Sequence, residues 1–426
     1  MKKNKVAANW TICLECKGRG KKSRGISKKN RLRHKAALEQ FEKSNKQETA
    51  PELPKGHLYT CSTCSGSGII PSEKSTIVDT ENYPHIAIIG AGIGGVALAV
   101  ACLHRGIPFT IFERDNDYEA RSQGYGLTLQ QASKAIEGFG VSQLESSVIS
   151  SKHLVHTTDG KVIGEWGMRK WMPSAEINSQ KRTNIHISRQ SLRQALLEQL
   201  GEKNRVHWGH QLVDFKDVND EKITLNFLVN GNIKQATADL IVGADGIRSS
   251  VRKLLIGDEI TPLRYLGCIV ILGICPLSFL KDLKSPLLDS ATVFQTANGN
   301  ERIYIMPYDQ ETVMWQLSFP MFEADAKLLS AKGPRALKEE ACRRTPWHKP
   351  IPQIVEATLE TQISGYPVYD RQILTSEMMD TAKRATLIGD AAHPMSPFKG
   401  QGANQALIDA LTLARELTNG CNAFSQ

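Results

Sequence analysis

The chain has 426 residues, 41% of them hydrophobic, which is enough apolar material for a substantial core and for two or three domains. Its net charge of +9 is uneven, because residues 1–80 hold 17 Lys and Arg against 7 Asp and Glu. The basic character therefore belongs to an N-terminal appendage, read most simply as a solvated segment, and a uniformly basic protein is excluded.

Targeting signals and membrane spans are not expected in this sequence. The start, MKKNKVAANW, is charged but has no apolar run after it, so it does not resemble a secretory signal. Residues 86–103 are uncharged and long enough for a span, but four glycines and a strand-turn-helix pattern argue against one. Nine cysteines, four of them in a metal-binding pattern, indicate a cytoplasmic protein with reduced thiols.

The pattern C-x-x-C-x-G-x-G occurs twice near the N-terminus, in TICLECKGRG and in YTCSTCSGSG. Two thiolates from one tight turn can face one ion, and the glycines relieve the backbone around it. Two matched pairs suit a tetrahedral zinc ion, with a redox dithiol or a disulfide pair as the alternatives. The predicted ligands are Cys13, Cys16, Cys61 and Cys64.

This repeat resembles the cysteine-rich repeat of DnaJ-type chaperones, which implies a zinc-clipped β-hairpin that helps to hold unfolded polypeptide. Those chaperones usually carry four copies, whereas this chain has two and lacks the J-domain signature, so the resemblance supports the zinc clip only. Between the copies, residues 17–35 are very basic and 31–46 suit a polar helix, which allows contact with protein or nucleic acid. Residues 1–70 are thus a predicted zinc-binding module, and 71–84 a linker.

Residues 85–115, HIAIIGAGIGGVALAVACLHRGIPFTIFERD, organise everything that follows. Residues 86–89 read as a buried strand, 96–103 as a helix and 109–112 as a second strand that ends in Glu113. The spacing G-x-G-x-x-G supplies a tight turn, a close approach of amides to a pyrophosphate, and close helix–strand packing. The helix N-terminus would face the phosphates and the acid the adenosine ribose. The motif indicates a dinucleotide, FAD or NAD, at Gly90, Gly92 and Gly95.

The middle of the chain continues with a loop and a helix after residue 121. Ser188 can cap a helix whose apolar face carries Leu192, Leu196 and Leu200. Strands are expected at 206–208 and 223–229, with a hairpin turn at Asn230-Gly231. Residues 263–320 have the alternation of an antiparallel sheet that carries a pocket. We assign residues 150–180 and 262–370 mainly to a substrate domain within 85–426.

A second candidate nucleotide contact lies near the C-terminus, in ATLIGDAAHPMSPFKGQGANQALIDALTLARELTNG. Residues 385–388 read as a strand that leads to Asp390, 394–401 as a loop and 403–417 as an amphipathic helix. The carboxylate can accept a hydrogen bond from a ribityl hydroxyl, or it can cap a helix. The first amides of the helix can face a phosphate or the pyrimidine edge of a flavin.

Three motifs occur in this order: the glycine-rich turn, Ala244-Asp245-Gly246, and Gly389-Asp390-Ala391-Ala392-His393-Pro394. With them, the chain from residue 85 onward resembles the class A flavoprotein monooxygenases related to aromatic hydroxylases. Residues 113–121 and 389–409 look most like the flavin-dependent tetracycline-inactivating monooxygenases. The resemblance implies an α/β fold: a Rossmann-like, three-layer FAD-binding domain, and an antiparallel-sheet substrate domain.

The same resemblance implies roles for single residues. Glu113 would hold the adenosine ribose with Arg114 near the adenine, and Arg121 would lie near FAD or NADPH. Asp245 would belong to a loop tied to both cofactors, and Asp390 would bind the ribityl-phosphate region. Further cofactor contacts would come from Arg189, and from Gly400, Gly402 and Asn404 at the isoalloxazine edge. Substrate contacts would come from Gln295, Pro397 and Phe398.

Two features depart from the family. A carboxylate that the tetracycline-inactivating enzymes carry after the glycine loop aligns with Thr128, which argues against tetracycline itself as the substrate. Family members usually continue past the last motif into a long C-terminal helix, whereas this chain ends at Gln426. We therefore expect the backing of the substrate domain to be shortened or supplied differently.

In this family NADPH delivers a hydride to FAD, and the reduced flavin adds dioxygen to form a 4a-hydroperoxide that hydroxylates an electron-rich substrate. The protein must exclude water, and no side chain need be a nucleophile, so we name no catalytic residue. His393 is either an acid or base, or structural.

The sequence thus predicts an FAD-dependent, NAD(P)H-consuming monooxygenase that acts with dioxygen on a small aromatic or polycyclic substrate. The alternatives are a flavin-dependent halogenase, an FAD reductase, or a zinc-clip binding module with a non-catalytic flavin domain. A halogenase would show W-x-W-x-I-P, which residues 165–171, EWGMRKW, do not match.

Overall fold

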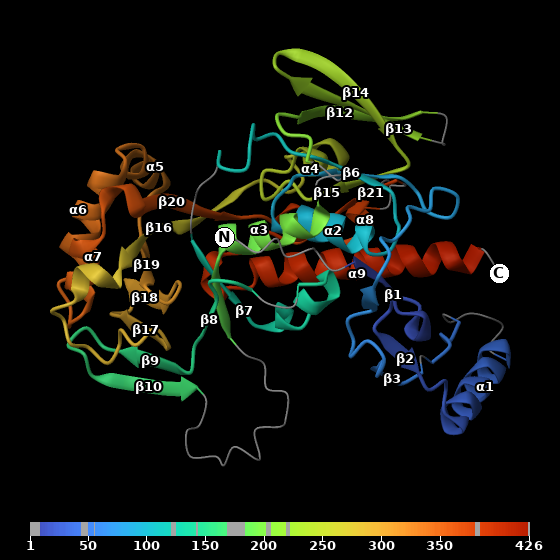
Figure 1. The fold of residues 1–426 in the computed structure, drawn as a ribbon, viewed down its shortest axis with the longest axis horizontal. Coiled ribbons are helices and arrows are strands. Elements are labelled where there is room, and N and C mark those ends of the chain that lie inside the picture. The colour runs from blue at the N-terminus through green and yellow to red at the C-terminus, as the bar shows by residue number, and fades with distance from the viewer. Residues whose placement is uncertain are drawn as a thin grey trace.

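The computed structural model describes residues 9–43, 50–54, 56–120, 125–141, 144–167, 184–201, 206–218, 222–379 and 384–424. Figure 1 shows three parts along the long axis: a seven-stranded sheet with its helices at one end, a central layered region, and a small N-terminal part at the other end. Helix α9 (Gly402–Phe424) runs through the central region and reaches the N-terminal part.

The central region is built on a parallel sheet with the strand order β21-β15-β5-β6. Its strands are Ala385–Leu387, Leu240–Gly243, Ile86–Ile89 and Phe109–Phe112. Strands β5 and β6 match the sequence prediction, and β21 ends one residue earlier than expected. Strands far apart in the chain therefore end at one edge, beside the glycine-rich turn.

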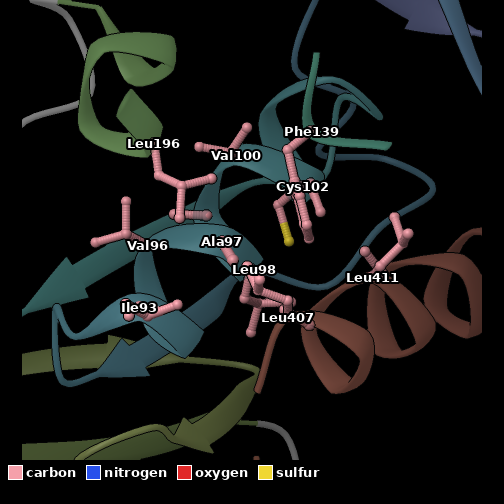
Figure 2. Packing of buried hydrophobic residues seen from close by; sticks show 14 of the residues in the cluster. Ile93, Val96, Ala97, Leu98, Val100, Cys102, Phe139, Leu196, Leu407 and Leu411 are labelled. Atoms are coloured by element: carbon pink, nitrogen blue, oxygen red, sulfur yellow. The ribbon is translucent and has the colours of Figure 1, made fainter. Parts of the chain in front are cut away.

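Helix α2 (Ile93–Leu103) begins three residues before the predicted start and is the centre of the core. It has no charged residue and is buried on nearly all sides, as an apolar helix must be. Figure 2 shows Leu196 from α3 (Arg189–Leu200), Phe139, and Leu407 and Leu411 from α9 around it. Ser188 caps α3 as predicted, because its hydroxyl accepts from the Ser191 amide at 2.8 Å.

The seven-stranded sheet has the order β10-β9-β17-β18-β19-β16-β20. Its strands are Val162–Gly167, Lys152–His156, Thr292–Ala297, Arg302–Pro307, Thr312–Pro320, Arg264–Pro276 and Ile363–Asp370. The predicted antiparallel pairing holds except between β9 and β17, which are parallel. One face packs on helices α5 (Glu323–Ala331), α6 (Pro334–Arg344) and α7 (Ile351–Ala357), and these helices supply the backing of the sheet.

Two smaller sheets and two short helices complete the central region. Strands β12 (Gln211–Val218), β13 (Lys222–Val229) and β14 (Asn232–Ala238) form a meander with the predicted turn at Asn230-Gly231. Strand β7 (Gly126–Leu129) pairs with β11 (Ile185–Ser188), which also pairs with β8 (Val148–Ile149). The short helices are α4 (Ser250–Ile256) and α8 (Ser376–Met379).

Two local predictions are wrong. The loop and helix expected after residue 121 form strand β7 and then 3-10 turns, the second over Ile136–Phe139, in the described part of this segment. The strand expected at 206–208 is a single bridge from His207 to Phe112, because the chain meets the edge of β6 for one residue only.

The N-terminal part contains two small antiparallel pairs and one helix. Strand β1 (Asn9–Ile12) pairs with β4 (Ile69–Ser72), and β2 (Lys21–Ser23) pairs with β3 (Leu58–Thr60). Helix α1 (Lys28–Lys43) starts and ends three residues before the predicted polar helix, and none of its residues is buried. Among the described residues, no helix is long and apolar enough to cross a membrane.

Candidate functional site

A cavity of about 1030 Å³ lies between the parallel sheet and the seven-stranded sheet. A smaller hollow of about 130 Å³ adjoins it beyond the ends of β5 and β6. The two share Gly92, Arg114, Arg189 and Gly246. Ligands of open α/β sheets bind outside the carboxyl ends of the strands, which is where the two hollows meet.

The three glycines of the turn have different surroundings. A Cβ on Gly90 would lie 2.6 Å from the Ala244 carbonyl oxygen, and one on Gly95 would lie 1.8 Å from the Gly90 carbonyl oxygen. A Cβ on Gly92 would meet no protein atom within 4 Å, although its φ of −71° suits any residue. Gly92 caps the N-terminus of α2, so the open space beside it is a cradle that a pyrophosphate would fill.

Glu113 lines the smaller hollow, and its Oε2 accepts from the Ala91 amide at 2.7 Å. Each carboxylate oxygen has a second lone pair, which leaves Glu113 able to accept from a ribose. Arg193, which the sequence reasoning missed, donates from Nε to the Ala91 carbonyl at 2.7 Å and lies over the Tyr118 ring. Its spacing of four residues from Arg189 on one helix was the available signal. Together the two charged side chains hold the glycine-rich turn by its amide and its carbonyl.

Asp245 lines the smaller hollow and organises the start of α4. Its carboxylate accepts from the Ser249 hydroxyl and from the Ser250 amide, the latter at 2.7 Å. Burial raises the pKa of Asp245, although these donors act in the other direction. Arg252, also missed, donates from Nη1 to the carbonyls of Ala391 and Ala392 at 3.0 Å. The second and third motifs are thereby tied together.

Asp390 lines the main cavity. Its side chain is accessible to the solvent in this cavity, although protein atoms lie around it on several sides. Burial raises its pKa, while His393 and Arg189 lower it. His393 points to Asp409, with 2.6 Å between Nε2 and Oδ2, and this carboxylate raises the pKa of His393. The same Asp409 oxygen accepts from the Gly389 amide at 2.9 Å. This geometry favours a structural role for His393 over a role as acid or base. His393 is not one of the described residues that line the cavity.

Gly400 and Gly402 line the main cavity at the N-terminus of α9. Asn404 lies behind them, with no exposed surface, and its amide makes four hydrogen bonds to backbone. Its Oδ1 accepts from the Gln130 and Ala132 amides, and its Nδ2 donates to the Thr128 and Gly400 carbonyls. Asn404 is therefore placed to position the loop rather than to touch a ligand.

The far wall of the main cavity is one face of the seven-stranded sheet. Gln295, a predicted substrate contact, lies on this wall, and its Oε1 accepts from Arg302 Nε at 2.8 Å. Pro397 and Phe398 line the opposite side. Several other aromatic side chains contribute to the lining, among them Tyr125, Trp166, Tyr304 and Tyr366.

Arg302 was not predicted to line the cavity. Burial lowers its pKa, and no carboxylate among the described residues forms an ion pair with it. The alternation Arg302, Tyr304, Met306 along β18 separates these residues from the buried Ile303 and Ile305. That alternation identifies one face, but only the tertiary structure shows that the face lines a cavity instead of the protein surface.

The predicted site residues thus come together with three exceptions. Gly95 and Asn404 lie behind the cavity walls, and Arg121 falls outside the described residues. A dinucleotide fits the remaining set: an open cradle at Gly92, cationic Arg114 and Arg189, and acids at both ends. The main cavity is at the upper end of the usual range for ligand pockets, about 300–1,000 Å³, which leaves room for a second molecule.

The four cysteines of the N-terminal repeat form a second candidate site. Their sulfur atoms all lie within 4.8 Å of one another, with Cys13 and Cys61 at 4.0 Å and Cys16 and Cys64 at 3.7 Å. Zn–S bonds of about 2.3 Å in a tetrahedron separate the sulfurs by about 3.8 Å. These distances suit four ligands of one metal ion and are too long for disulfide bonds.

Backbone amides support the sulfur atoms symmetrically. The Gly20 amide donates to Cys16 Sγ at 3.2 Å, and the Gly68 amide donates to Cys64 Sγ at 3.3 Å. A Cβ on Gly20 would lie 2.2 Å from the Gly66 carbonyl oxygen, and one on Gly68 2.3 Å from that of Gly18. The sequence repeat is therefore a structural repeat, in which the glycines of each copy pack on those of the other.

A family model described as an FAD binding domain matches residues 84–422. The chain belongs to this FAD-binding family. The aurachin C monooxygenase/isomerase of Stigmatella aurantiaca is 32% identical to this chain over 340 residues, which are 78% of the chain and 80% of the relative. The resemblance to flavoprotein monooxygenases is thereby confirmed. The chain spans about half the length of the plant zeaxanthin epoxidases that it also matches.

Solved structures share the fold of this monooxygenase. The 2,6-dihydroxypyridine-3-hydroxylase of Arthrobacter nicotinovorans is 20% identical, with a TM-score of 0.65 over 81% of the chain and 85% of that structure. A tetracycline destructase is 19% identical, with a TM-score of 0.54 over 79% of the chain and 82% of that structure. The predicted α/β fold with an FAD-binding domain is confirmed.

Proposed function

We propose that the chain uses NAD(P)H and dioxygen to hydroxylate a small aromatic or polycyclic substrate in the main cavity. In this reaction the substrate gains one oxygen atom, the second oxygen leaves as water, and NAD(P)H becomes NAD(P)⁺. The observation that carries the proposal is the continuity of one cavity, from the glycine cradle to an aromatic-lined wall of the seven-stranded sheet. Two further relatives, named a 3-amino-4-hydroxybenzoate 2-monooxygenase and a 6-hydroxynicotinate 3-monooxygenase, support the substrate class, since both names describe aromatic compounds.

The chain's own residues would bind and orient the cofactor. Gly92 and the N-terminus of α2 would take the pyrophosphate, Glu113 and Arg114 the adenosine end, and Asp390 the ribityl chain. Bound FAD supplies the electron transfer to dioxygen and the oxygen transfer to the substrate. The first amides of α9, at Gly402, would face the flavin ring with the positive end of the helix dipole.

The cavity wall would exclude water and orient the substrate. Tyr304, Met306 and Met314 present apolar surface from neighbouring strands, which keeps a reactive cofactor away from solvent. Arg302 and Gln295 form the polar spot on this wall. Because Arg302 forms no ion pair with a carboxylate in the described part of the chain, it favours a substrate that carries a phenolate, carboxylate or other electron-rich oxygen.

The decisive experiment is a visible spectrum of the purified protein followed by substrate screening. We expect flavin bands that NADPH or NADH bleaches, faster when phenols, quinolones or other aromatic compounds are present. The product from ¹⁸O₂ should carry one heavy oxygen atom. Halogenated product would favour a halogenase, and NAD(P)H oxidation without oxygenated product would favour an FAD reductase. Protein that binds no flavin would contradict the proposal.

Replacing Arg302 tests the orientation of the substrate. Arg302→Met should raise KM for an anionic or phenolic substrate by about 10- to 100-fold, because a charge-assisted hydrogen bond contributes about 1.5–3 kcal/mol. Arg335→Met, which removes an exposed arginine on α6, is the matched control. Equal KM values for the two variants would show that Arg302 does not contact the substrate.

We also propose that Cys13, Cys16, Cys61 and Cys64 bind one zinc ion, supported by their sulfur geometry. Elemental analysis should give about one zinc per chain, and the double variant Cys13→Ser/Cys61→Ser should lose it. Unchanged metal content in that variant would contradict the assignment. Thiolate ligands require a reducing compartment, which supports a cytoplasmic location.

A further inference from the structure

Two arginines of the FAD-binding domain lie against the cysteine repeat, the buried Arg105 and the half-buried Arg415. Arg415, in the second half of α9, donates from Nη2 to the carbonyls of Gly66 at 2.9 Å and Ser67 at 3.0 Å. Arg105 follows α2 and is 1% exposed. Its Nη2 would be 3.4 Å from a Cβ on Gly68, so its guanidinium abuts the second copy of the repeat.

Within the described residues, these guanidinium groups have nitrogen atoms without hydrogen-bond acceptors and no carboxylate as a counter-ion. Arg105 donates from Nη1 to the Ala101 carbonyl at 2.9 Å, but its Nε and Nη2 are buried without a hydrogen-bond partner. The Nε of Arg415 is also buried and unpartnered. Among the described residues, neither arginine forms an ion pair with a carboxylate. A buried cation in such surroundings is strongly destabilising unless an anion lies nearby.

A metal-loaded repeat supplies that anion. Four thiolates around one Zn²⁺ carry a net charge of −2, and two arginines carry +2. The backbone amides of Gly20 and Gly68 reach the sulfurs, but they add no net charge. The two arginines of the neighbouring domain bring an equal and opposite charge to this side of the repeat.

We propose that Arg105 and Arg415 complete the zinc site electrostatically, so that the cysteine repeat is a metal-dependent brace on α9 rather than an independent module. The inference rests on the proposed zinc site and adds the FAD-binding domain to it. The same helix begins at Gly402 in the main cavity and passes Arg415 in its later turns. Figure 1 shows the N-terminal part beside this end of α9. Metal loading would therefore stabilise the helix that also borders the flavin.

Further contacts show how closely the two parts fit. A Cβ on Gly18 would lie 3.6 Å from the Thr418 methyl group of α9, and one on Gly140 would lie 2.4 Å from Trp10 Nε1. The repeat thus packs on the central region through several elements. Loss of the metal should therefore change the stability of the central region.

The test measures zinc retention in the full-length holoprotein. Arg105→Met and Arg415→Met should each release zinc to a chromogenic chelator about 10-fold faster or more, since partners around the metal ligands change metal affinity by about 10- to 100-fold. Arg31→Met, which removes an exposed charge from α1, should behave like the wild type. Release rates equal to those of Arg31→Met would overturn the inference. Wild-type protein without zinc would instead overturn the zinc assignment itself.

A second measurement covers variants that do not fold. Arg415→Lys keeps the charge and should retain zinc better than Arg415→Met. In the reverse direction, chelating zinc from wild-type protein should lower the thermal midpoint of the FAD-binding domain. The increase in flavin fluorescence when FAD is released would report this midpoint. An unchanged midpoint after complete zinc removal would show that the repeat is an independent module, which also overturns the inference.

Discussion

The glycine-rich turn of the FAD cavity and the glycine-rich cysteine repeat use the same residue for opposite purposes. At Gly92 the missing side chain leaves open space beside a helix N-terminus, so a ligand can approach the backbone. At Gly20 and Gly68 the missing side chain is what allows carbonyl groups of the other copy to pack within contact distance. One site is hollow and has room for a large molecule, whereas the other is compact and would hold a single ion.

The largest effect is expected from a substitution that disrupts the packing of the cysteine repeat. Gly68→Ala would place a Cβ 2.3 Å from the Gly18 carbonyl oxygen at a φ of +85°. We expect a loss of about 2–6 kcal/mol in the stability of the repeat, the sum of the usual costs of overpacking and of a strained backbone. Zinc content and thermal unfolding would measure it. A variant that keeps full zinc occupancy at the wild-type midpoint would mean that the two copies do not pack as described.

Gly92→Ala should have the opposite profile. No protein atom lies within 4 Å of the new methyl group, so stability should change by less than about 1 kcal/mol. FAD affinity should fall about 10-fold or more, because the methyl group occupies the space of the pyrophosphate. Gly420→Ala, an exposed position of α9 with equally open space, is the control for affinity and midpoint. FAD titration that gives one dissociation constant for both variants would remove Gly92 from the cradle.

Asp390→Asn sharpens the comparison at the polar end of the cavity. The variant loses the charge but keeps the shape, so FAD affinity should fall by about 10-fold, as for the loss of a charge-assisted hydrogen bond. Asp282→Asn, at an exposed position, should leave FAD affinity unchanged. Titration by flavin fluorescence gives both values. Equal affinities would place the ribityl chain away from Asp390.

The smallest effect concerns the pH dependence of the third motif. Because Asp409 raises the pKa of His393, the pair stabilises the fold below the pKa of an unfolded histidine, and this stability is lost as pH rises through the raised value. The contribution should stay at or below about 1 kcal/mol, since the imidazole is partly exposed. The difference in thermal midpoint between wild type and His393→Gln should be larger at pH 6 than at pH 8. A difference that grows toward pH 8 would contradict the ion pair.

Much of the central region could be predicted because its signals are local. An uninterrupted apolar run predicts β5, and Ser188 predicts the start of α3. The glycine spacing predicts the turn between β5 and α2. The wrong prediction at 206–208 has a non-local cause. Residues 206–208 have the composition of a strand, but they meet β6 at His207 only, and strand formation requires a partner along the whole segment.

Side-chain roles were harder to predict than elements. Asn404 lies in a motif that implies cofactor contact, yet its amide is fully used by four backbone partners. Arg302 has no motif around it, and its proposed role comes from its place on the cavity wall, where it forms no ion pair with a carboxylate among the described residues. Three of the four Asn404 partners lie more than 270 residues away, and such partners leave no mark in a local pattern.

The sequence by itself determined the strand-turn-helix unit, the order of three motifs and the paired cysteines, since each depends on spacings of a few residues. Only the tertiary structure decided that one sheet face lines a cavity, that Arg193 and Glu113 hold one turn, and that Arg105 and Arg415 lie against the cysteine repeat. The physical reason is that burial and charge balance depend on which distant segments meet. Those meetings are fixed by the packing of whole helices and sheets, above all around α2 and α9.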